Sequence, residues 1–229
     1  FLLETINNKV RGRRDLNEVT IPFIGEIPMY RHHRTWKEKL WGPWVKLGRN
    51  LKSLILRTPP KEDKTLHILV KDHSRNVINE AFRVIRTNIE FMTAKGGRGK
   101  VIMLTSFDPN SGKTFVVTNL ITSFAIKKQK VLAIDLDPQG NTTSGVGVQK
   151  KGLKSTVKDL LVHDGEIGSD ELAELVKSTV VETKYSNLSI IPATISLAGA
   201  EFDLFSEDER EFCLKKALDT LKNDFDYMI

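Results

Sequence analysis

The sequence has little cysteine and no long apolar run. Its 229 residues include a single cysteine, Cys213, so no disulfide can form within the chain, which fits a reducing compartment. No apolar stretch approaches the roughly 20 residues that a bilayer-spanning helix needs. The five histidines show no spacing typical of metal ligands. These absences exclude a small disulfide-stabilised fold and a complete transmembrane helix within this sequence.

The composition that is present is that of a globular and basic chain. Hydrophobic residues make up 40% and charged residues 28%, which excludes a wholly disordered or collagen-like chain. The 35 lysines and arginines outnumber the 29 aspartates and glutamates, giving a net charge of +6. This balance favours anionic partners such as phosphates, nucleic acid or an acidic membrane surface.

Residues 1–66 differ from the rest, because they hold all three tryptophans and an excess of Lys and Arg. An apolar start runs into a basic cluster at residues 9–14, as on the cytoplasmic side of a transmembrane helix or in a clipped loop of a basic protein. Apolar residues recur every three or four positions from Trp36 to Leu54. They indicate an amphipathic helix, which either packs on the main domain or lies among lipid headgroups. We interpret residues 1–66 as a juxtamembrane linker.

From about His67 the pattern alternates between strands and helices. Helices are predicted over 78–92, 112–128, 155–162, 169–178 and 207–224. Strands are predicted over 67–70, 101–106, 131–137, 188–192 and 225–229. Continuous apolar runs such as 101–106 are typical of parallel strands buried on both faces. The fold class is therefore α/β, with a doubly wound, mostly parallel sheet flanked by helices over residues 67–229. The chain ends inside a predicted strand, so we expect this domain to be truncated at its C-terminus.

The strongest chemical signal is SFDPNSGKT, residues 106–114, which lies between a predicted strand and a predicted helix. In a phosphate-binding loop, backbone amides and the helix N-terminus converge on phosphate oxygens. Gly112 allows close backbone approach, Lys113 reaches the β and γ oxygens, and the Thr114 hydroxyl can ligate Mg²⁺. Phe107 replaces the first glycine of the usual pattern. The motif predicts a P-loop that binds ATP and Mg²⁺. The expected nucleotide contacts are Asp108, Pro109, Asn110, Ser111, Gly112, Lys113, Thr114 and Phe115.

A second group of candidates, Asp135 and Asp137, follows the next predicted strand. Ligands of open parallel sheets bind beyond the carboxyl ends of the strands, so both carboxylates are expected to face the loop. There they could hold Mg²⁺ together with Thr114, and Asp135 could orient or deprotonate the attacking group while Lys113 neutralises charge. The alternative is a solvated turn after the strand.

Residues 1 to about 133 resemble the cytoplasmic part of bacterial tyrosine kinases, the P-loop kinases of polysaccharide export. The matching pieces are IPFIGEIP at 21–28, NEAFRVIRTNIEFM at 79–92 and VIMLTSFDPNSGKTF at 101–115. Glu80, Arg83 and Arg86 have the spacing by which that family assembles into homo-oligomeric rings, although such a triplet is also common on a solvated helix face. The resemblance implies a membrane-associated kinase at the cytoplasmic face of the bacterial inner membrane. It would transfer the γ-phosphate of ATP to protein tyrosines in exopolysaccharide or capsule synthesis.

From about residue 134 the chain resembles ParA/Soj-type partitioning ATPases, on IDLDPQGNTTSGVG and NLSIIPATISLAGAE. That resemblance implies a nucleotide switch that acts on DNA. Each likeness has departures: Asp108 stands where partitioning ATPases carry a lysine, and Gln139 stands where the kinases carry a basic residue. The tyrosines form no cluster, and the next expected acidic residue would follow Ile229. A hybrid of two related families is therefore expected, and a fragment without activity of its own is a third possibility.

Overall fold

The computed structural model describes residues 24–28, 68–72, 74, 76–95, 97, 99–105, 112–162, 167–205 and 209–229. The chain divides into two compact units, of which one contains residues up to Ile27 and from His67 onward, and the other residues 28–66. The predicted amphipathic helix and the basic N-terminal cluster lie outside the described residues. No helix among the residues described here combines the length and the apolar character needed to cross a membrane.

A mostly parallel sheet forms the centre of the larger unit. Its strands are β1 (Lys100–Val101), β2 (Val131–Ile134), β3 (Val181–Glu182), β4 (Leu188–Ile191) and β5 (Tyr227–Met228). They are ordered β1-β5-β2-β4-β3, and all neighbours pair in parallel except β3 and β4. This arrangement confirms the predicted α/β class.

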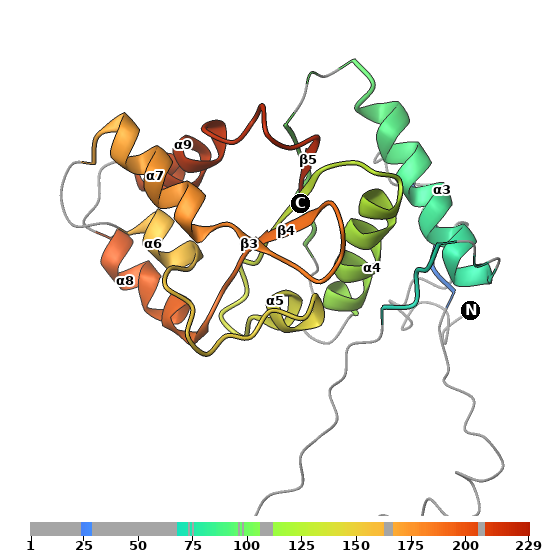
Figure 1. Ribbon diagram of the computed structural model, residues 1–229, viewed down its shortest axis with the longest axis horizontal. Helices are drawn as coiled ribbons and strands as arrows, with labels where there is room; N and C mark the ends of the chain where they lie inside the picture. Colours follow the sequence, from blue (N-terminus) through green and yellow to red (C-terminus); the bar gives the residue numbers. More distant parts are fainter. Residues whose placement is uncertain are drawn as a thin grey trace, which may run out of the picture. The chain divides into compact units, whose positions relative to one another are not determined.

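Helices cover both faces of the sheet (Figure 1). One face carries α3 (Val77–Met92) and α4 (Lys113–Ile126), and the other carries α6 (Val157–Leu161), α7 (Ser169–Thr179) and α9 (Cys213–Asp219). The shorter elements are α5 (Asn141–Gly145), η2 (Ile195–Gly199), α8 (Ala200–Leu204) and η3 (Arg210–Phe212). Successive side chains of a strand point to opposite faces, so Val131 packs with the α3–α4 layer and Leu132 with the α6–α9 layer. Burial on both faces explains the continuous apolar run of β2.

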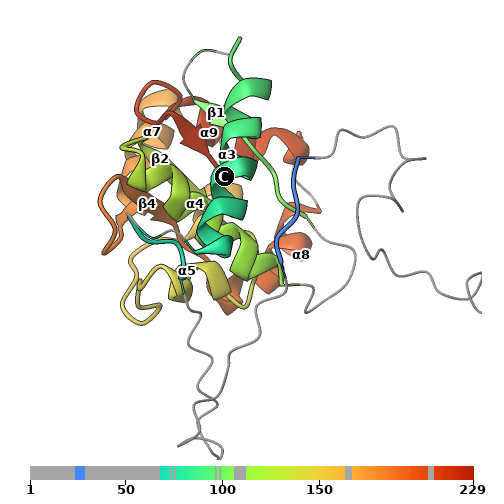
Figure 2. The same ribbon diagram turned by 90° about the vertical axis from the view of Figure 1, so that its right-hand side faces the viewer.

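Helix α3 forms close to where the sequence predicts it. Its N-cap is Asn76, whose Oδ1 accepts a hydrogen bond of 2.7 Å from the Asn79 amide. The buried face contains Ile78, Phe82 and Ile89, at the helical spacing expected. Figure 2 shows residues 24–27 running along this helix.

The contact between residues 24–27 and α3 is close. The carbonyl of Ile24 accepts a 2.7 Å hydrogen bond from Asn88 Nδ2. A Cβ at Gly25 would lie 2.7 Å from Ile85 Cγ1, so only glycine allows this approach. Residues 24–27 therefore pack against α3 within the larger unit.

Three predicted elements differ in the structure. Residues 68–70 form no strand, because an asparagine side chain, not a neighbouring strand, accepts the hydrogen bonds from the amides of Leu69 and Val70. In the described residues 101–105, the predicted buried strand is reduced to the end of β1, which pairs only with β5 within the described sheet, and Val101 is 60% and Met103 81% exposed. The predicted helix 207–224 is replaced by η3, α9 and turns in its described part.

Candidate functional site

The described part of the phosphate loop begins at Gly112. Asp108, Pro109, Asn110 and Ser111 lie outside the described residues, so their expected contacts stay predictions. Gly112 has a φ of +82°, in the left-handed region that favours glycine, and it caps α4. The bond from Val116 N to Gly112 O, 3.0 Å, is the first along this helix. The amides of Lys113, Thr114 and Phe115 precede it, so they face out of the helix N-terminus, where an anion is favoured.

A hollow of about 410 Å³ lies at this helix start, beyond the carboxyl ends of the central strands. Its polar lining consists of Lys113, Thr114, Asp135, Asp137 and Thr142. These residues come from α4, from the loop after β2 and from α5, and apolar side chains from α4, α9 and the ends of β1, β2 and β5 line the rest of the hollow. The structure therefore brings the lysine and threonine of the loop and both aspartates to one cavity. Phe115 is not among the lining residues and packs with the core beside Phe82, their ring centroids 6.1 Å apart.

Asp135 is the most constrained of these side chains, with only 3% of its surface exposed. Its Oδ2 accepts hydrogen bonds from Thr143 N at 2.8 Å and Thr143 Oγ1 at 2.7 Å, and its Oδ1 accepts one from Asp137 N at 3.2 Å. Burial raises the pKa of the Asp135 carboxyl above its ordinary value, and the bonds from Thr143 counteract part of this rise. Asp135 is thus a fixed carboxylate with increased proton affinity.

Asp137 lies two residues further on and is half-buried. Its Oδ1 accepts a hydrogen bond from Gln139 N at 2.9 Å, and its Oδ2 accepts one from Asn141 Nδ2 at 3.1 Å. These bonds orient the side chain within the turn that follows β2. The Gln139 carbonyl in turn accepts a hydrogen bond from Lys150 Nζ, so a basic side chain reaches this turn from a distant position.

Thr143 is a site residue that the sequence analysis missed. It is fully buried, donates twice to Asp135, and its Oγ1 accepts a hydrogen bond from Ala193 N at 3.1 Å. It therefore ties the loop after β2 to the chain that follows β4. Thr143 stands within the IDLDPQGNTTSGVG stretch, but that stretch does not indicate a role for it, because it meets Asp135 only through the fold of α5.

The chemistry of these donors fits a magnesium nucleotide. A hydroxyl and two carboxylates offer the hard oxygen ligands that Mg²⁺ prefers. A lysine and a helix N-terminus offer the positive charge that phosphate oxygens require. Thr114, Asp135 and Asp137 are the residues that would hold the metal, and Lys113 would face the phosphates.

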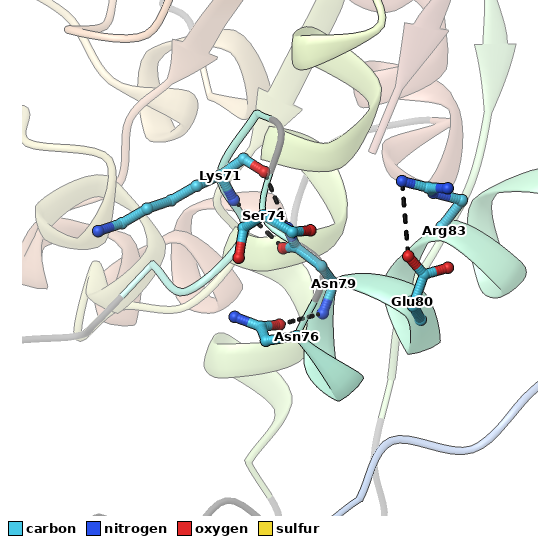
Figure 3. A network of polar contacts seen from close by, with 6 residues as sticks. All are labelled: Lys71, Ser74, Asn76, Asn79, Glu80 and Arg83. Carbon is cyan, nitrogen blue, oxygen red and sulfur yellow. Dashed lines mark hydrogen bonds and ion pairs between the residues drawn. The ribbon is translucent and has the colours of Figure 1, made fainter.

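The triplet on α3 does not share one face. Glu80 and Arg83 are both about half-exposed and form an ion pair of 3.6 Å, seen at the right of Figure 3. Arg86 is 6% exposed and its Nη1 donates a 2.7 Å hydrogen bond to the Ser123 carbonyl of α4. Six residues along a helix correspond to a turn of roughly 120° away from the starting direction. Arg86 therefore packs against α4 instead of sharing the exposed face of Glu80 and Arg83, and the oligomerisation role expected of the triplet stays a prediction.

The two arginines should respond differently to truncation. Arg86→Ala removes a charged donor from a buried carbonyl, so we expect it to lower the free energy of unfolding by about 1–3 kcal/mol. Arg83→Ala, its exposed control on the same helix, should change that energy by less than about 0.5 kcal/mol but lower the oligomeric mass. Urea denaturation and light scattering measure the two effects. Equal destabilisation by both variants would contradict the structural role of Arg86, and an unchanged mass would contradict a role of Arg83 in assembly.

The family model described as AAA domain (AAA_31) matches residues 99–229. The sporulation initiation inhibitor protein Soj of Bacillus subtilis (strain 168) is 42% identical over 131 residues, which cover 57% of this chain and 48% of Soj. The chromosome partitioning protein ParA of Myxococcus xanthus (strain DK1622) is 37% identical over 131 residues, covering 57% of this chain and 43% of ParA. The chain spans about half the length of these curated relatives.

Solved structures of bacterial tyrosine kinases are similar over most of the chain. The kinase domain of Escherichia coli tyrosine kinase ETK has a TM-score of 0.62 at 20% identity, covering 95% of this chain and 71% of that domain, and shows the fold alone. The BceF tyrosine kinase domain has a TM-score of 0.57 at 25% identity, covering 94% of this chain and 72% of BceF. Cyanothece McdA in complex with ATP has a TM-score of 0.50 at 28% identity, covering 58% of this chain and 48% of McdA.

These comparisons confirm the resemblance to two related families. The family match begins at residue 99, ahead of the phosphate loop, and so earlier than the expected change near residue 134. The tyrosine-kinase domains are similar over a larger share of the chain. The chain belongs to the AAA domain family and has the fold of a P-loop ATPase.

Proposed function

We propose that this chain is the ATP-binding domain of a membrane-associated protein-tyrosine kinase linked to exopolysaccharide or capsule synthesis and export. The observation that carries the proposal is the hollow bordered by Lys113, Thr114, Asp135 and Asp137. Similarity to the BceF kinase domain over 94% of the chain favours a kinase, since the AAA domain match starts at residue 99 and leaves out α3.

In this proposal each side chain has a defined task. Lys113 and the amides at the start of α4 bind the phosphates and stabilise the negative charge on the transferred group. Thr114, Asp135 and Asp137 hold Mg²⁺, which neutralises charge on the phosphate oxygens when it is bound. Asp135, a fixed carboxylate at the edge of the hollow, orients the tyrosine hydroxyl or accepts its proton.

The distribution of charge supports a membrane partner for the N-terminal segment. Residues 1–66 contain 14 Lys and Arg against 7 Asp and Glu, whereas residues 67–229 contain 21 against 22. The net positive charge of the chain therefore arises before the core domain. A basic segment with tryptophans is attracted to the anionic inner surface of a membrane. We place the protein at the cytoplasmic face of the bacterial inner membrane, as a homo-oligomeric ring.

The second candidate is a ParA/Soj-type nucleotide switch that acts in DNA partitioning. The 42% identity to Soj over 131 residues favours it. The nearly neutral charge of the core domain does not favour a DNA-binding switch, because non-specific DNA binding depends on basic residues that contact the phosphates.

Two assays of the 229-residue chain distinguish these functions. For a kinase, we expect γ-labelled ATP with Mg²⁺ to label tyrosines of the chain or of a Glu/Tyr copolymer, detected as phosphotyrosine by mass spectrometry. The Lys113→Ala variant is the matched control and should give no label. ATP hydrolysis that duplex DNA accelerates, with no phosphotyrosine formed, would overturn the kinase proposal in favour of the switch.

A further inference from the structure

The chain before α3 is held to the core by two asparagine side chains. We call residues 68–72 and 74 the strap. Asn79 of α3 holds its second half: Nδ2 donates to the carbonyls of Lys71 at 2.8 Å and Ser74 at 2.6 Å, and Oδ1 accepts from Lys71 N at 3.2 Å. Figure 3 shows this amide between Lys71 and Ser74. These contacts connect the strap to α3.

The first half of the strap is bound by Asn119 of α4 instead. The Oδ1 atom of Asn119 accepts hydrogen bonds from Leu69 N at 2.8 Å and Val70 N at 3.1 Å. Its Nδ2 donates to the Phe115 carbonyl at 2.9 Å. Asn119 has no exposed surface, so water does not replace these bonds when they break.

The Phe115 carbonyl, which accepts the bond from Asn119 Nδ2, lies in the first turn of α4. Phe115 directly follows Lys113 and Thr114, whose amides and side chains form the start of the helix at the hollow. The carboxamide of Asn119 is planar, so its acceptor and donor ends move as one group. A displacement of Leu69 and Val70 therefore changes the hydrogen bond to the first turn of α4.

We propose that Asn119 is a positioning residue that couples the strap to the first turn of α4 and thereby sets the affinity of the nucleotide site. This inference rests on the proposed nucleotide binding. The strap connects residues 28–66 to α3 along the chain, so an event in that segment that shifts Leu69 and Val70 is transmitted to the phosphate-binding residues. Asn79 provides a comparison within the molecule, because its side chain holds the same strap through hydrogen bonds to Lys71 and Ser74 instead of to α4.

Hydrogen exchange on the nucleotide-free chain tests the coupling first. We expect Asn119→Ala to accelerate exchange of the backbone amides of residues 116–119 by about tenfold, because the first turn loses a hydrogen bond and its connection to the strap. The matched control Asn79→Ala should accelerate exchange in the strap and leave residues 116–119 unchanged. Equal acceleration of residues 116–119 in both variants would overturn the proposal, since it would make Asn119 one of several general stabilising residues.

Titration with the ATP analogue ATPγS and Mg²⁺ then measures the consequence for binding. We expect Asn119→Ala to raise Kd by about 5- to 10-fold and Asn79→Ala to change it by less than about twofold.

If Asn119→Ala does not fold, Leu69→Pro serves instead, because it removes one strap donor and leaves the bond from Asn119 to Phe115. Leu69→Pro should raise Kd in the same direction by about two- to fivefold, and an unchanged Kd overturns the coupling. Wild-type protein that binds no ATPγS would contradict the proposed function, whereas the exchange result would still decide the coupling.

Discussion

Lys113→Ala should raise the Kd for an ATP analogue by at least about 100-fold, which corresponds to roughly 2.7 kcal/mol of binding free energy. Among the described residues that line the hollow, Lys113 is the only cation. Without its amine, the phosphate charge would be balanced only by helix amides and by Mg²⁺ bound to the aspartates. Isothermal titration of the variant with ATPγS and Mg²⁺ measures the loss.

The control for this variant lies on the same helix. Lys127 caps the opposite end of α4, is exposed, and does not line the hollow, so Lys127→Ala should leave Kd unchanged. Circular dichroism should show that both variants keep the fold, because both lysines are exposed. An ATPγS affinity of Lys113→Ala equal to that of the wild type would refute the assignment of the phosphate loop.

The elements that the sequence predicts well are those whose signals are local in the sequence. Helix α3 combines an asparagine cap with apolar residues at helical spacing, and each of these signals lies within the element itself. Strand β2 is central in the described sheet, so its apolar run reflects burial on both faces. The loop lysine and threonine were predictable for the same reason, because strand, motif and helix are adjacent in the chain.

The features that the sequence does not reveal depend on distant partners. The strap has the apolar pattern of a strand, but Asn119, about fifty positions away, binds its amides. Arg86 has the spacing of a surface triplet, but α4 covers it. Thr143 becomes a site residue only because α5 brings it beneath Asp135. In each case tertiary packing overrides a local pattern.

Asp135→Asn should lower the rate of phosphoryl transfer or ATP hydrolysis by about 10²- to 10⁴-fold, the usual effect of removing a general base. The amide oxygen can still accept both hydrogen bonds from Thr143, whereas the amide nitrogen cannot accept the 3.2 Å bond from Asp137 N, so the side chain loses that bond together with its charge and its basicity. Steady-state turnover at saturating ATP and Mg²⁺ measures the effect. Asn141→Ala, which removes only a donor to Asp137, is the control and should reduce turnover by less than about tenfold. Full activity of Asp135→Asn would exclude Asp135 as the base.

Asp135→Asn should lower turnover, but its free energy of unfolding should rise relative to that of the wild type between acid and neutral pH. Burial raises the pKa of Asp135 in the folded state, so the folded chain binds this proton more tightly than the unfolded chain does. The free energy of unfolding therefore falls as pH rises from the unfolded pKa, about 3.9, through the higher folded pKa, and this loss persists at neutral pH. Asp135→Asn removes that loss, so the variant should gain stability relative to the wild type as pH rises from about 3.5 to 7. Urea denaturation of both proteins across this range measures the difference. A variant that instead loses stability relative to the wild type with rising pH would mean that bonds to the ionised carboxylate outweigh its burial.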